Sequence, residues 1–126
     1  LWCMLSNMPS FSDEQVLLAK TVSDFAKAEI EPHAHALDES EGFNDKAFKN
    51  MGELGLLGVT ISEEFGGSGL GAVESTLVME KMAEACASTT LSYLAHSILV
   101  ANNILENASP EQKSKYLPGW MSGSTM

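Results

Sequence analysis

One segment in the second half of this chain is apolar on almost every side of the helix that it is predicted to form. It runs from about residue 89 to residue 107, and its apolar residues are Leu91, Leu94, Ala95, Ile98, Leu99, Val100, Ala101, Ile104 and Leu105. On a helix these positions go most of the way round the cylinder. A helix that is apolar all round must be buried all round, and one small bundle rarely supplies so much cover. The segment therefore predicts an all-α chain that packs against further domains.

The first half of the chain predicts two more helices, towards a total of about five or six. Ser12 and Gln15 form a capping-box pattern, so a helix is expected to follow a tail of residues 1–11. Pro32 predicts a kink or a break near Glu31, because proline lacks the N–H that a helix interior needs. Asn44 is expected to cap the second helix. The apolar residues of that helix are Phe48, Met51 and Leu54. Residues 12–126 together are predicted to form one helical domain.

Three further helices are predicted after the middle of the chain. Residues 72–86 follow an amphipathic pattern. The positions expected to face inward are Val73, Leu77, Val78, Met82, Ala85 and Cys86. Ser88 is expected to cap the apolar helix. Ser109 is expected to cap the last one, which has proline at its first position and ends near Pro118 or Ser122.

A loop that contains Gly66, Gly67, Gly69 and Gly71 joins the second and third helices. Glycine lets backbone amides approach an anion, so one interpretation is a phosphate-binding loop. No strong strand precedes it, however, and neither GK[ST] nor GxGxxG is present. The residues favour a tight turn that needs positive φ angles. The neighbouring Glu63 and Glu64 would point about 100° apart on a helix, so they are expected to be solvated rather than to form an acid–base pair.

The composition excludes several classes of function. The chain has 17 acidic and 7 basic residues, a formal net charge of −10, and every basic residue is a lysine. Such a chain repels a phosphate backbone and lacks arginine, the usual bidentate reader of phosphate and guanine, so nucleic-acid binding is not expected. No apolar run approaches the roughly 20 residues of a membrane span. The three histidines and two cysteines show no metal-binding spacing. Cys3 and Cys86 are interpreted as thiols rather than as a disulfide pair.

Two features of the apolar helix are candidates for function. His96 is the first, as a titrating group, although a histidine here is more often a core residue with satisfied nitrogens. The second is a stripe at i, i+1, i+4 and i+8 with a small residue at its centre, formed by Leu91, Ser92, Ala95 and Leu99. From the residues alone this stripe, which we call the wall stripe, is a core surface first and the wall of an apolar ligand site second.

Five runs of residues, in order and with their spacing, are similar to the acyl-CoA dehydrogenase family. They are residues 54–60, 65–71, 77–80, 91–97 and 112–118. The resemblance covers nearly the whole chain, from about residue 11 to residue 123, and corresponds to the amino-terminal helical domain of that fold. The run LSYLAHS at residues 91–97 is most similar to the isovaleryl-type members, which act on short branched acyl chains in leucine catabolism. Leu94 stands where a glycine is expected in those members.

The resemblance implies a protein of three domains, with a middle β domain and a carboxy-terminal helical bundle after this one. It implies α,β-desaturation of an acyl-CoA thioester, with FAD as the hydride acceptor and electron-transferring flavoprotein as the protein that reoxidises the flavin. In the family the catalytic glutamate and the main flavin contacts lie outside this domain, so no catalytic, cofactor-binding or metal-binding residue is assigned here. The chain alone is expected to be inactive and not to bind FAD.

The resemblance also reverses the order of the two interpretations of the wall stripe. It implies that Leu91, Ser92, Ala95 and Leu99 form part of the acyl-chain wall. The parent enzyme is expected to be a homo-oligomer, in the mitochondrial matrix of a eukaryote or the cytoplasm of a bacterium. Two alternatives remain: a straight-chain acyl-CoA dehydrogenase or oxidase of the same fold, and a free-standing helical interaction module that uses the apolar helix as a dimer face.

Overall fold

A computed structural model of the chain describes residues 10–125, and these residues are helical without a strand among them. The helical segments join end to end into five helices. They are α2 (Asp13–Phe25) with the π-helical η1 (Ala26–Ile30) and α3 (Glu31–Glu39), then α4 (Asp45–Glu53), α5 (Ala72–Ala83), α6 (Ala87–Tyr93) with the π-helical η4 (Leu94–Ala101) and α7 (Asn102–Asn107), and α8 (Pro110–Met121). Two 3₁₀ turns, η2 (Leu56–Gly58) and η3 (Glu63–Phe65), lie between α4 and α5. The predicted all-α class is confirmed.

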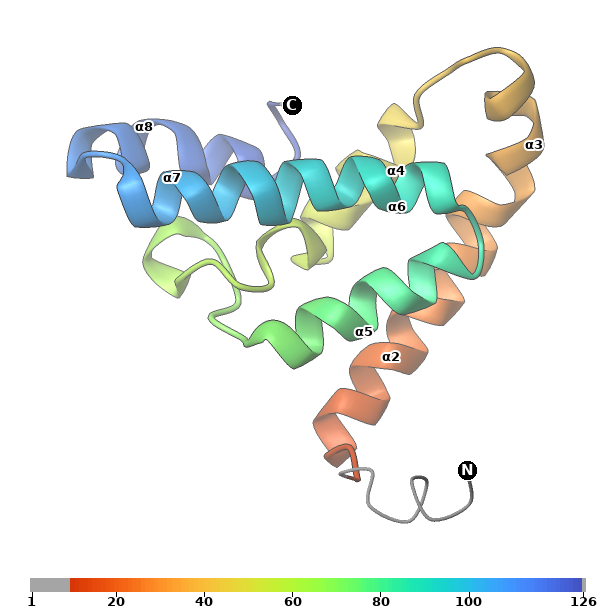
Figure 1. The fold of residues 1–126 in the computed structure, drawn as a ribbon, viewed down its shortest axis with the longest axis horizontal. Coiled ribbons are helices and arrows are strands. Elements are labelled where there is room, and N and C mark those ends of the chain that lie inside the picture. Colours follow the sequence, from red (N-terminus) through yellow and green to blue (C-terminus); the bar gives the residue numbers. More distant parts are fainter. Residues whose placement is uncertain (1–9, 126) are drawn as a thin grey trace.

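The helix α6–η4–α7 crosses the length of the molecule, and the other helices are arranged about it (Figure 1). Helix α8 turns back beside α7, while α5 and α2 pack together on the other side. One core cluster joins α2, α4, α5 and α6, with Phe48, Met82 and Tyr93 among its fully buried side chains. A second cluster consists of Ile61, Ala101, Leu117 and Met121, and ties α8 to η4.

The predicted caps are confirmed at three helix starts and wrong at one. Ser12 and Ser109 each form a complete capping box, and the Asn44 side chain accepts a hydrogen bond from the backbone of α4. Ser88, however, lies inside α6, and the cap is Cys86. Its Sγ accepts from the Thr89 N–H at 3.5 Å. The pairing of Cys86 with Cys3 is not tested, because Cys3 lies outside the described residues, as does most of the predicted tail.

The chain does not break at Pro32. The π-helical turn η1 precedes it, the Glu31 N–H bonds to the Ala26 carbonyl, and Pro32 lies at the start of α3, where a missing N–H is tolerated. Helix α8 likewise runs through Pro118 to Met121.

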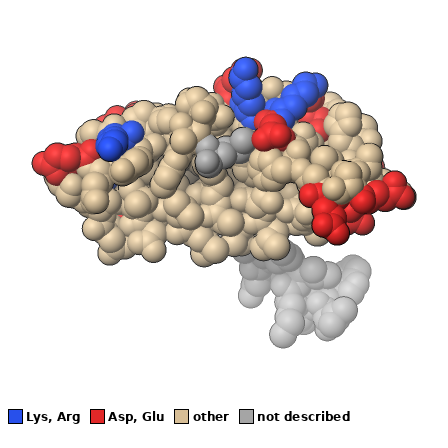
Figure 2. All heavy atoms as spheres, turned by 90° about the horizontal axis from the view of Figure 1, so that it is seen from above, with Lys and Arg blue, Asp and Glu red and all other residues tan. Residues whose placement is uncertain are grey.

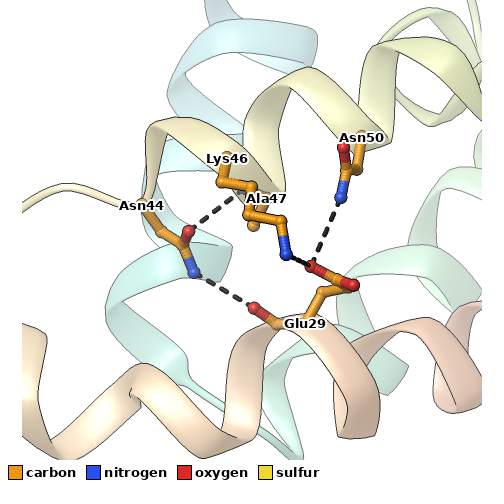
Figure 3. A network of polar contacts seen from close by, with 5 residues as sticks. All are labelled: Glu29, Asn44, Lys46, Ala47 and Asn50. Atoms are coloured by element: carbon orange, nitrogen blue, oxygen red, sulfur yellow. Dashed lines mark hydrogen bonds and ion pairs between the residues drawn. The ribbon is translucent and has the colours of Figure 1, made fainter.

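A network of polar contacts then holds α4 against η1 (Figure 3). The Asn44 Nδ2 donates to the Glu29 carbonyl at 3.2 Å, and the Lys46 Nζ lies 2.9 Å from Glu29 Oε2. The Asn50 Nδ2 donates to the same Glu29 carboxylate at 3.3 Å. Glu29 thus contacts the cap of α4 and two positions within the helix.

The glycine loop is a tight turn, as the residues favoured. Gly66 ends η3 with a φ of 86°, a conformation that favours glycine. Gly67 lies so close to Ile61 that a Cβ there would overlap the Ile61 carbonyl. Glu63 and Glu64 lie in the 3₁₀ turn η3 and are exposed, as expected.

Predicted burial is wrong at Val73, which was expected to face inward and is 50% exposed. Leu54 is also exposed at the end of α4. On the apolar helix, whose cover is expected from further domains, Leu91 is 67% and Leu99 is 59% exposed. Within the described residues this helix is covered on one side only, because no other element of the chain reaches its outer face.

Candidate functional site

The inner and outer faces of the helix α6–η4 carry different chemistry. Its inner face is a stripe of Tyr93, Ser97 and Ala101, which are all buried. The wall stripe is offset from the inner stripe by two residues and points outward, with Leu91, Ala95 and Leu99 exposed and Ser92 half-buried. The wall stripe is therefore not part of this chain's core, and the first interpretation of it is wrong. What remains is an apolar surface that the chain leaves uncovered.

A hollow opens beside the middle of this surface. It has a volume of about 360 Å³, within the range of small-molecule sites. Its lining residues are Phe43, Phe48, Ser92, Ala95, His96, Val100 and Trp120. The structure thus brings Ser92 and Ala95 to the hollow, whereas Leu91 and Leu99 lie outside its lining. None of these described lining residues carries a charged side chain, so the hollow suits an apolar group.

Two aromatic rings that form one side of the hollow are placed by the start of α4. Phe43 precedes the cap Asn44, and Phe48 follows in the first turn of the helix. Their ring centroids are 4.7 Å apart, the contact of a hydrophobic staple. These two residues were not among the predicted site residues, although a phenylalanine on either side of a predicted cap is a signal that could have found them.

Helix α8 supplies the opposite side. Trp120 stacks on Tyr116 one turn earlier, with ring centroids 6.0 Å apart. His96 lies between Trp120 and Phe48, at centroid distances of 6.4 Å and 6.1 Å. Nothing in the local sequence brings Trp120 to residues on η4, so only the fold of α8 back along the long helix could reveal it.

His96 does not match its predicted role as a core residue with satisfied nitrogens. Its Nδ1 lies 3.5 Å from the Ser97 Oγ, but its Nε2 is buried and has no hydrogen-bond partner among residues 10–125. Burial lowers the pKa of His96, because a charged ring loses hydration there. The ring is therefore neutral at neutral pH, with one polar atom unsatisfied.

The other polar candidates do not converge on this hollow. His33 and His35 are exposed on α3. Between residues 10 and 125 the His, Cys, Asp and Glu side chains form no group of three that could hold a metal ion. None of the described helices combines the length and the hydropathy needed to cross a bilayer. On one face of the molecule, charged side chains gather towards the ends and along an edge, and leave a broad area without them (Figure 2).

Comparison with known proteins identifies this arrangement of helices. The family model "Acyl-CoA dehydrogenase, N-terminal domain" matches residues 12–124. The mitochondrial isovaleryl-CoA dehydrogenase of Bos taurus is 41% identical over 89% of this chain and 27% of its own length. The chain therefore spans little more than a quarter of that relative.

Two solved structures share the fold. One is an acyl-CoA dehydrogenase from Bacillus anthracis complexed with FAD, with a TM-score of 0.85 and 37% identity over 92% of this chain and 20% of that one. The other is described as the electron transferring flavoprotein of Acidaminococcus fermentans, with a TM-score of 0.86 and 27% identity over 93% of this chain and 31% of that one.

Proposed function

The chain belongs to the acyl-CoA dehydrogenase family as an amino-terminal domain, and we propose that it forms part of the acyl-chain pocket of such an enzyme. The enzyme would catalyse α,β-desaturation of a short branched acyl-CoA such as isovaleryl-CoA. The observation that carries this proposal is the exposure of the wall stripe, at whose centre Ala95 is exposed and borders an apolar hollow.

Exposure of large apolar side chains has a free-energy cost that a covering group removes. Burial of one leucine side chain contributes about 1.5–3 kcal/mol, and both Leu91 and Leu99 are more than half exposed. An acyl chain, together with the other domains of the enzyme, would cover them. The small methyl group of Ala95 leaves space between the two leucines for a branch.

The described residues do not fit FAD as its holders. The diphosphate of FAD needs cations or convergent backbone N–H groups, and the lining of the hollow supplies neither. The glycine loop is a packed turn in which the amides of Gly67 and Gly69 are already bonded to carbonyls. The flavin would therefore be held by other parts of the enzyme.

The location, electron acceptor and assembly that we propose are taken by analogy with the relatives. A mitochondrial matrix location suits a eukaryotic source and the cytoplasm a bacterial one, since relatives of both kinds occur. Electron-transferring flavoprotein is the electron acceptor that the proposal includes, and a homo-oligomer is its expected assembly. A broad area without charged side chains on one face, which other subunits or domains could cover, supports the assembly (Figure 2).

Two alternatives can be separated from this proposal. A straight-chain dehydrogenase or oxidase would use the same wall with a different chain preference. A free-standing helical module would use the exposed face of η4 as a dimer interface. The hollow favours a ligand site over the module, because a dimer face formed from one helix needs no cavity beside it.

The test begins with the gene beyond the codon for Met126, where a dehydrogenase continues into a β-rich domain. The whole product is then expressed and assayed for acyl-CoA-dependent reduction of an electron acceptor, with isovaleryl-CoA and butyryl-CoA as substrates. We expect turnover of both with a preference for isovaleryl-CoA. A preference for butyryl-CoA would support the straight-chain alternative, and a folded product that desaturates neither would refute the proposed activity.

A further inference from the structure

A second hollow adjoins the one that borders Ala95. It has a volume of about 470 Å³, and Phe43, Phe48 and Ser92 line both hollows. The other lining residues of the second hollow come from α3, from the loop before α4 and from the start of α6. The two hollows are therefore neighbours that meet at these three shared residues.

The two hollows also follow one another along the helix α6–η4. The lining of the first hollow runs on this helix from Val100 past Ala95 to Ser92. The lining of the second continues from Ser92 to residues 86–89. Since these positions are about one helical turn apart, the wall passes from one hollow to the next without a gap. A chain that ran past Ala95 towards the start of α6 would meet the boundary at Ser92.

The Phe43 ring lies at this boundary and can be changed without opening the core. Phe48 is almost fully buried in the first core cluster, whereas Phe43 is 46% exposed. The two ring centroids are 4.7 Å apart. The next residue, Asn44, holds the loop by accepting from the Ala47 N–H at 3.1 Å and by donating to the Glu29 carbonyl at 3.2 Å. The boundary is thus a ring on an anchored backbone.

The second hollow suits hydrocarbon at the end nearest the boundary, because its polar side chains there already have partners. The Ser92 Oγ donates to the Ser88 carbonyl at 3.2 Å, and the Thr89 Oγ1 donates to the Cys86 Sγ at 3.3 Å. The acidic lining residue Asp38 is exposed on α3, so it keeps its hydration. A hydrocarbon chain that entered the second hollow would leave these hydrogen bonds in place.

We propose that Phe43 is a specificity-determining residue, and that its ring limits the length of the acyl chain by closing the hollow beside Ala95 towards the second hollow. This inference rests on the proposed function, since it treats the hollow beside Ala95 as the acyl-chain site. A short chain ends before the ring, whereas a longer chain overlaps with it. A misfit of one methylene group in an apolar pocket changes discrimination by ~10–200-fold, so a single ring is enough to separate chains by length.

The experiment measures selectivity for chain length on the whole enzyme. The probes are butyryl-CoA and octanoyl-CoA, which are both straight and differ only in length. Phe43→Ala removes the ring at the boundary, and the control Phe11→Ala removes an equally exposed ring that borders a separate hollow on α5. We expect Phe43→Ala to raise the kcat/KM ratio of octanoyl-CoA to butyryl-CoA by at least ~10-fold, and Phe11→Ala to leave it unchanged.

A second variant and the FAD content keep the test independent of folding. Phe43→Leu shortens the side chain but keeps an apolar contact with Phe48, so it should raise the ratio by a smaller factor. It replaces the alanine variant in the comparison if that variant does not retain FAD. A variant that holds FAD and keeps the ratio of the unmodified enzyme would overturn the role of Phe43, while the proposed function would stand.

The remaining outcomes also decide between the two proposals. If the unmodified enzyme turns over octanoyl-CoA as well as butyryl-CoA, the ring does not limit chain length and this inference is overturned. An equal rise of the ratio in Phe43→Ala and Phe11→Ala would show that the position of the ring is not the cause, which overturns it too. If the unmodified enzyme desaturates neither isovaleryl-CoA nor butyryl-CoA, the proposed function is refuted and the role of Phe43 falls with it.

Discussion

Helix α5 and the π-helical segment η4 are both rich in apolar side chains, but they turn them in opposite directions. In α5 the large residues Leu77, Val78 and Met82 are buried against α2 and the rest of the core. In η4 the buried residues are Ser97 and Ala101, while Leu99 and Val100 are exposed. Helix α5 therefore stabilises the domain, whereas η4 leaves its large apolar side chains exposed for a ligand or another domain to cover.

This difference has a physical reason in what each inner face meets. Small residues on the inner side of η4 let the long helix lie close to η2, so that the Tyr93 hydroxyl reaches the Leu56 carbonyl. The outward leucines then contribute little to the stability of the chain on its own. A helix whose best apolar side chains face outward is favoured only if a ligand or another domain covers them.

The largest expected effect comes from truncating the same kind of side chain on the two helices. Met82→Ala should lower the free energy of unfolding of the chain by about 2–5 kcal/mol, because the side chain is fully buried. Leu99→Ala should change it by no more than about 0.5 kcal/mol, since Leu99 is 59% exposed. Denaturant unfolding of both variants measures this. Equal losses would contradict the assignment of η4 as an outward-facing helix.

A change of function without a change of stability is the next prediction. Ala95→Glu should lower kcat/KM for isovaleryl-CoA by at least ~10-fold in the whole enzyme, because it places a carboxylate against hydrocarbon and fills the space for the branch. FAD content and thermal stability should stay close to those of the parent, since Ala95 is exposed in this domain. The control is a straight-chain substrate: an equal loss on both substrates, in step with the folded fraction, would refute the pocket assignment.

A smaller effect is expected on association. The chain at tens of micromolar should self-associate or bind a hydrophobic dye, because exposed apolar patches of several hundred Å² tend to associate. Leu99→Lys should reduce both signals, whereas Leu54→Lys, an exposed leucine at the end of α4, should reduce them less. Analytical ultracentrifugation and dye fluorescence check this. A monomeric protein that does not bind the dye would show that the outer face of η4 is too small to matter.

The smallest effect should appear in the pH dependence of the α2–α5 pair. The Gln15 Nε2 donates to Glu74 Oε1 at 2.7 Å, and the Gly71 N–H donates to Glu74 Oε2 at 2.9 Å. The hydrogen bond from Gln15 is the main reason that the pKa of Glu74 is lowered from 4.5. A lowered folded-state pKa contributes stability that is present above 4.5 and is lost as the pH falls through the folded value.

Thermal unfolding between about pH 7 and pH 3 tests this link. Glu74→Gln should show a shallower loss of stability below the ordinary glutamate pKa than the unmodified chain. The control is Glu63→Gln, since Glu63 is an exposed glutamate of η3. Identical pH profiles for Glu74→Gln and the parent would show that the contact between Gln15 and Glu74 does not form in solution.

Much of the fold could be predicted because its signals are local. The Ser12 and Ser109 capping boxes and the Asn44 cap depend on residues within four positions, and each is present. The cap at Cys86 was missed, because a thiol is a weak acceptor and Ser88 looked like the better cap. The π-helical segments η1 and η4 were also missed, since a widened turn is a response to packing and to Pro32, and no residue type specifies it.

The candidate site was predictable only in part. Ser92 and Ala95 were assigned from the pattern and the family resemblance, and the structure places both at the hollow. Phe43 and Phe48 could have been found from the staple around Asn44. Trp120 and the unpartnered nitrogen of His96 could not have been found from the sequence, because they depend on where α8 lies and on which neighbours Nε2 has.

The amino-acid sequence by itself determined the all-α class, the starts of most helices, the turn at the glycine loop and the family, because these depend on neighbouring residues or on the order of short runs. Tertiary structure alone decided which face of the apolar helix is buried. Apolar residues lie on almost every side of that segment, so periodicity cannot choose a direction. The choice is made by close contact: the small residues Ser97 and Ala101 allow neighbouring elements to approach, and the leucines are left to face outward.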